Sequence, residues 1–140
     1  MSAKKKLEQT VQRMEHHLEC WKQFNDFVLL ARAKKFTSED ESQFLEIKCV
    51  LTQELELLLA SVESPCINRQ EIHELLASAP SIRFLSERDD QSLVALENHW
   101  HKLFLSWQSL LGQLKVRKQE LDSRSFLSSL FETKKKTIDK

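Results

Sequence analysis

An unbroken heptad pattern between residues 93 and 121 constrains this chain more than any other feature. Its apolar residues recur in alternating steps of three and four, and only Arg117 interrupts the series. Such a repeat predicts one long α-helix with a continuous buried face. The first position of each heptad holds Leu93, Trp100, Trp107, Leu114 and Leu121, and the fourth holds Leu96, Leu103 and Leu110.

Further apolar residues widen this stripe and indicate a bundle. Phe104 and Leu111 occupy the fifth heptad position, and three apolar positions per heptad are typical of a helix packed in a bundle rather than in a bare two-stranded coil. We expect Trp100 and Trp107 to fill the core, although a tryptophan pair can also line a ligand cavity. Gly112 falls on the solvent side of the helix.

Two more long helices are predicted ahead of this one. Apolar residues from Leu7 to Val28 repeat the same spacing and predict a helix over residues 4–35. Ser38 and Glu41 have capping-box spacing and open a second helix that extends to Val62. Because the link between the two helices is short, they should pack antiparallel.

The segment between Pro65 and Pro80 predicts a cap over one end of the bundle. Asn68 is a candidate N-cap for a helix of about three turns that ends near Ser78. After Asp122, the polar residues 123–125 separate the heptad from one last apolar cluster.

These patterns predict an all-α fold, an antiparallel up-down-up bundle of three long helices with a short capping helix and a short C-terminal helical segment. Residues 1–123 would form a single helical-bundle domain, and residues 124–140 an amphipathic, basic tail. In this arrangement the first and third helices end at the same pole. Their basic residues would then cluster there, namely Lys34, Lys35, Lys115, Arg117 and Lys118.

Composition favours a non-enzymatic cytoplasmic protein. The chain has one glycine and contains no G-x-S-x-G, H-E-x-x-H or phosphate-binding loop. Basic and acidic residues number 21 each, so a nucleic-acid partner is not expected. The N-terminal region contains no apolar run, so we expect neither a signal peptide nor a transmembrane segment. Cys20, Cys49 and Cys66 should be reduced, partly buried thiols.

The histidines are candidate metal ligands. His16 stands four residues before Cys20, a spacing that two ligands on one helix can share. Their heptad positions place both on the solvent side, and His99 and His101 are two residues apart, which points them to different faces. The Glu-x-x-His motif of di-metal bundles is absent. We therefore predict no metal site, no cofactor and no catalytic residue.

The sequence favours an α-helical protein–protein interaction module, such as an adaptor, a chaperone-like protein or an assembly subunit, with a protein partner and possible homo-oligomerisation. The alternatives are a ligand- or metal-binding bundle that uses histidines and tryptophans, and peripheral contact with a membrane or nucleic acid through the basic ends. An amphipathic tail segment is the predicted partner-binding element. Its residues are Phe126, Leu127, Leu130, Phe131, Lys134, Lys135 and Lys136.

Overall fold

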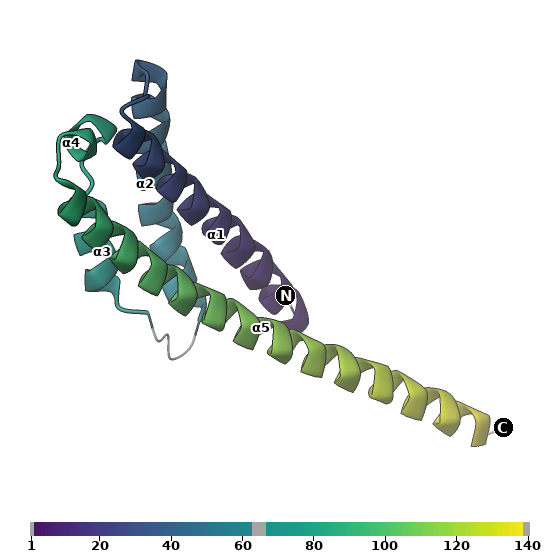
Figure 1. Ribbon diagram of the computed structural model, residues 1–140. Coiled ribbons are helices and arrows are strands. Elements are labelled where there is room, and N and C mark those ends of the chain that lie inside the picture. The colour runs from purple at the N-terminus through teal and green to yellow at the C-terminus, as the bar shows by residue number, and fades with distance from the viewer. Residues whose placement is uncertain (1, 63–66, 139–140) are drawn as a thin grey trace.

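The computed structural model describes residues 2–62 and 67–138, which contain helices and their connections and no strand. The helices are α1 (Ala3–Ala33), α2 (Ser38–Ser61), α3 (Arg69–Ala77), α4 (Ile82–Ser86) and α5 (Asp90–Ile138) (Figure 1). The predicted all-α class is therefore confirmed. Pro65 and Cys66, which the sequence places at the start of the crossover, lie outside the described residues.

N-cap residues set where α2 and α3 begin. Thr37 is the N-cap of α2: its hydroxyl accepts the Asp40 N–H at 3.1 Å, and the Asp40 carboxylate accepts the Thr37 N–H at 2.8 Å. The predicted box starting at Ser38 was wrong by one residue because Thr37-x-x-Asp40 offers the same spacing. Asn68 caps α3 as predicted and accepts two backbone N–H groups.

Helix α1 lies in the middle of the molecule and contacts α2, α4 and α5. Its predicted heptad residues are buried, and so is an adjacent column of His17, Phe24 and Ala31. Phe24 lies 5.3 Å from Phe44 of α2, measured between ring centroids. Because long helices pack on it from two sides, α1 buries a wider face than a single heptad stripe predicts.

The heptad stripe of α5 faces the core as predicted. Trp107 is fully buried, and Trp100 is partly buried with its Nε1–H donated to the backbone oxygen of Trp21 at 2.9 Å. Burial of the stripe extends through Leu114, and Leu121 is partly buried. The long-helix prediction is thus confirmed up to the point where α5 leaves the bundle.

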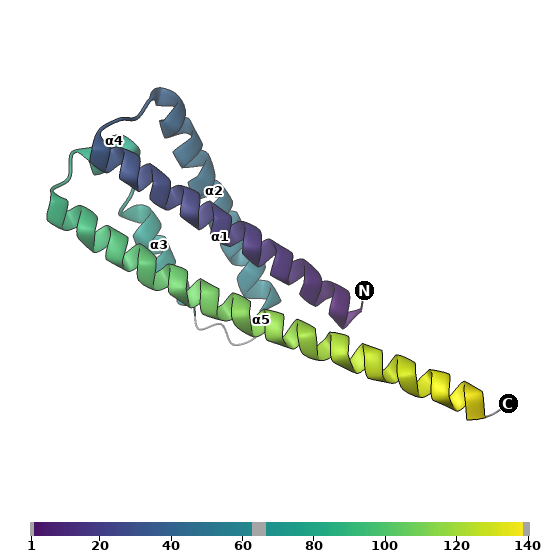
Figure 2. The same cartoon turned by 45° about the vertical axis from the view of Figure 1, so that its right-hand side comes forward.

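The direction of α5 corrects the predicted up-down-up arrangement. Arg32, near the end of α1, lies 3.2 Å from the Glu97 carboxylate near the start of α5. At the other end, Lys4 lies 3.0 Å from the Asp122 carboxylate. Helices α1 and α5 are therefore antiparallel, and α5 runs in the same direction as α2 (Figure 2).

The crossover explains this direction. Helices α3 and α4 together return the chain from the end of α2 to the end of α1, so α5 begins where α1 finishes (Figure 1). Glu41 of α2 fixes the return, because its carboxylate accepts the backbone N–H groups of Ile82 and Arg83 in α4 at 3.1 and 2.6 Å. The prediction treated this insert as a cap and did not count it as a return pass.

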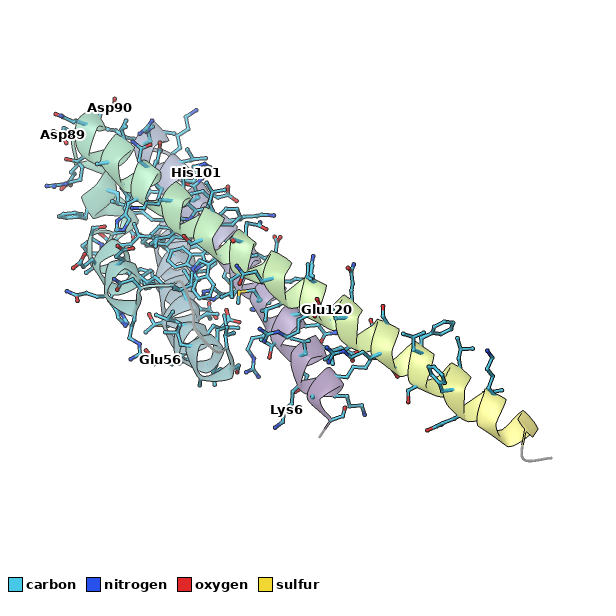
Figure 3. The ribbon with its side chains drawn as sticks, turned by 90° about the horizontal axis from the view of Figure 1, so that it is seen from below. Lys6, Glu56, Asp89, Asp90, His101 and Glu120 are labelled. Atoms are coloured by element: carbon cyan, nitrogen blue, oxygen red, sulfur yellow. The ribbon has the colours of Figure 1, made fainter. Side chains whose placement is uncertain are left out.

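Helix α5 continues without interruption to Ile138, which corrects the predicted separate C-terminal segment. Ser123, Arg124 and Ser125 include no glycine or proline, so the backbone has no cause to end the helix there. Asp122 pairs with Lys4 near the start of α1. The C-terminal part of α5 passes the N-terminal end of α1 and leaves the bundle (Figures 1 and 2). Figure 3 shows no other ribbon beside α5 well beyond Glu120.

Within the described ranges, none of the helices has both the length and the apolar composition required to cross a membrane.

Candidate functional site

A buried histidine lies at the centre of the bundle, between α1, α2 and α5. His17 is 0% exposed, and its ring centroid lies 4.6 Å from that of Trp107. Trp21, one turn further along α1, donates its Nε1–H to His17 Nε2 at 2.9 Å. Because Nε2 accepts this bond, the ring proton resides on Nδ1, which faces Glu54 Oε1 of α2 at 3.4 Å.

These surroundings keep His17 neutral. Burial, with a smaller contribution from the neighbouring His16, lowers the pKa of His17 from 6.5 to about 4, although Glu54 opposes the shift. Protonation of Nε2 would also remove the acceptor for the Trp21 N–H and leave that buried donor unpaired. His17 therefore serves as a fixed hydrogen-bonding link between Trp21 and Glu54.

Next to this link, His16, Cys20 and Glu54 converge from two helices. His16 Nδ1 lies 2.8 Å from Glu54 Oε2, and Cys20 Sγ lies 3.9 Å from His16 Nε2. The Glu54 side chain is 13% exposed and that of His16 is 63% exposed. Cys20 is buried, so the prediction that Cys20 faces solvent is wrong, and the premise of the no-metal prediction fails at this residue.

The order of cysteine, histidine and glutamate resembles an activated thiol nucleophile. Two features argue against that chemistry. Burial, reinforced by Glu54, raises the pKa of Cys20 to about 11, so the thiol keeps its proton at neutral pH. The backbone N–H groups around Cys20 lie in the middle of α1 and are engaged in the helix, so they cannot form an oxyanion hole.

A solvent-facing groove between α1 and α2 borders these residues. His16 and Cys20 line it together with Gln23, and Gln43 and Ile47 contribute from α2. The cluster can therefore exchange water or a small ion with solvent while Glu54 stays mostly enclosed.

The predicted partner-binding residues lie on the projecting part of α5. Phe126, Leu127, Leu130 and Phe131 are 65, 53, 48 and 71% exposed, and Lys134 is exposed as well. The four apolar side chains therefore do not pack on the bundle. Lys135 and Lys136 belong to α5, but their side chains lie outside the described part of the structure.

The predicted basic cluster does not form. Lys34 and Lys35 follow the end of α1, close to where α5 begins. Lys115 lies far along α5 and pairs with Glu15 of α1 at 3.5 Å. The basic residues are therefore distributed over opposite ends of the bundle, which weakens the alternative of a membrane or nucleic-acid contact through one basic pole.

The sequence contained a signal for His17 that the heptad assignment passed over. His17 precedes Phe24 by one heptad, and Phe24 precedes Ala31 by the same interval. This second column predicts a histidine on a buried face, and Trp21 one turn away offers its donor. Nothing in the sequence singles out Glu54, because its role depends on the register between α1 and α2.

No family model, curated protein or solved structure matches this chain.

Proposed function

We propose that this protein is a non-enzymatic, cytoplasmic interaction module that binds a protein partner through the projecting part of α5. The observation that carries the proposal is the exposure of four large apolar side chains on a helix that has left its own bundle. Their exposed fractions lie between 48 and 71% at Phe126, Leu127, Leu130 and Phe131.

The spacing of these residues supports a helix-in-groove contact. They lie at i, i+1, i+4 and i+5 and therefore share one side of α5. An apolar cluster of this size on a helix surface is commonly an interaction site. The bundled part of α5 continues directly into this segment, so the segment does not face the cost of helix nucleation that an isolated peptide would face.

The charge next to the cluster favours an acidic partner surface. Lys134 follows Phe131 by three residues and is exposed, and Lys135 and Lys136 continue the basic run in the sequence. A partner with an apolar groove bordered by carboxylates would match both features. A second copy of this chain is the competing occupant.

Deletion of residues 124–140 tests the proposal. The thermal midpoint should stay nearly unchanged, because the deleted side chains that the structure describes are exposed. The immobilised full chain should capture the partner from native cytosol, and the chain that lacks residues 124–140 should not. A large fall in the midpoint would show instead that these residues belong to the folded core.

A matched pair of double variants sharpens the test. Phe126→Ser with Phe131→Ser should abolish capture. Leu57→Ser with Leu105→Ser removes two large apolar side chains, 50 and 54% exposed, from the bundle surface and should leave capture intact. Equal loss in both pairs would contradict a specific role for the tail. Light scattering on the free chain identifies a self-associating dimer, which the same Phe variants should convert to monomer.

A further inference from the structure

Three side chains with metal-binding atoms meet between α1 and α2, away from the tail. One donor atom from each of His16, Cys20 and Glu54 lies within 4.8 Å of the other two. His16 and Cys20 are one helical turn apart on α1, and Glu54 reaches them from α2. The three residues therefore bring nitrogen, sulfur and oxygen ligands to one point from two helices.

A buried second layer holds the carboxylate in place. His17 is 0% exposed and directs Nδ1–H at Glu54 Oε1, while Trp21 fixes the other ring nitrogen of His17 at 2.9 Å. This leaves Glu54 Oε2 turned toward His16, at 2.8 Å. Hydrogen bonds of this kind from a second layer orient the ligands in metal sites and strengthen binding.

We propose that His16, Cys20 and Glu54 bind one Zn²⁺ ion that joins α1 to α2, with solvent as the fourth ligand. A set of one imidazole, one thiolate and one carboxylate suits zinc, which accepts nitrogen, sulfur and oxygen ligands in tetrahedral geometry. The groove lined by His16 and Cys20 supplies access for the ion and for the water ligand.

Small movements bring the donors to zinc geometry. Bonds of about 2.0–2.3 Å in a tetrahedron place donor atoms roughly 3.3–3.8 Å apart. His16 Nδ1 and Glu54 Oε2 lie 2.8 Å apart and must separate slightly. Cys20 Sγ lies 3.9 Å from the other ring nitrogen of His16, Nε2, so the exposed His16 ring must also turn to bring one nitrogen to an ion shared with both partners. Zinc binds a His16 ring nitrogen that carries no proton, so the ring proton resides on the other nitrogen, and the Cys20 thiol releases its proton to solvent as the Zn–S bond forms.

This site goes beyond the proposed partner binding and does not depend on it. Because its ligands lie on two helices, zinc binds the folded chain better than the unfolded one and raises the thermal midpoint. A chain lacking residues 124–140 keeps every residue of the site and should bind zinc as well as the full chain does. Loss of one function without the other therefore distinguishes the two proposals.

The test is zinc titration of the full chain, purified without a histidine tag and stripped with a chelator. Calorimetry should give one equivalent of Zn²⁺, and Co²⁺ should give a thiolate-to-metal charge-transfer absorption. Cys20→Ser, His16→Ala and Glu54→Gln should each abolish the midpoint rise with zinc. His17→Gln, which alters only the second layer, should weaken binding about 10–100-fold.

Cys49→Ser and His101→Ala are the controls, because both residues are exposed and lie outside the cluster. Both should bind zinc like the wild type. Circular dichroism of the metal-free variants checks that each is folded, and Glu54→Gln retains an acceptor for His17. Absence of stoichiometric zinc in the wild type, or full binding that survives in Cys20→Ser, overturns the proposal.

Discussion

Replacing Trp107 with alanine should be among the most destabilising single changes in this chain. Trp107 is fully buried, and it packs edge-on to His17 with 4.6 Å between ring centroids. A buried tryptophan removes about 150–250 Å² from water, and truncating such a side chain to alanine typically costs about 3–5 kcal/mol. Its Nε1–H has no hydrogen-bond partner among the described residues, so the loss includes no hydrogen bond.

That unpaired N–H makes Trp107→Phe an informative companion. Phenylalanine keeps an aromatic ring against His17 and removes a buried donor without a partner, so we expect a cost of only about 1–2 kcal/mol. Urea unfolding followed by far-ultraviolet circular dichroism measures both changes without relying on tryptophan fluorescence. Leu105→Ala, at a residue 54% exposed on the same helix, is the control. A Trp107→Ala variant within about 0.5 kcal/mol of wild type would refute the packing of this helix face.

Two further predictions concern backbone and protonation. Gly112→Ala should raise the free energy of unfolding by about 0.8–1 kcal/mol, seen as a higher urea midpoint, because alanine favours the helix and a Cβ at Gly112 has no atom within 4 Å beyond its chain neighbours and the adjacent helix backbone. With a chelator present, the free energy of unfolding should fall as the pH drops from about 6.5 toward about 4. In the folded chain the pKa of His17 is lowered to about 4, so over this range the unfolded chain binds a proton at His17 and the folded chain does not. The loss should reach at most about 3 kcal/mol and should be smaller in His17→Gln, whereas an equal pH slope in both proteins would contradict the assignment.

Heptad periodicity predicts most of the helices, because a helix that is buried on one face has apolar residues at regular spacing in its sequence. The stripe from Leu93 to Leu114 and the cap at Asn68 were both predicted correctly. No sequence pattern specifies the direction of α5 relative to α1. That direction depends on whether α3 and α4 only cover one end of the bundle or also carry the chain back along it. The contact that fixes it joins Glu41 of α2 to the backbone of α4, 41 and 42 residues further along the sequence.

The candidate site was harder to predict for the same reason. The sequence shows that His16 and Cys20 are four residues apart, but a single heptad stripe predicts both on the solvent side. Glu54 completes the cluster only in the observed register of α2 against α1, and no local pattern specifies that register. Contacts between helices thus decide both the burial of Cys20 and the meeting of the three ligands.

The continuity of α5 gives the projecting segment a fixed bearing. The same helix contributes Trp107 to the core and carries Phe131 in solvent, with no hinge between them. At 1.5 Å per residue, Ile138 lies about 24 Å beyond Asp122 along the axis. A partner bound to this segment would therefore be held at a fixed distance and orientation from the bundle. A small tilt of the α5 axis would move that partner through a much larger displacement, as at the end of a lever arm.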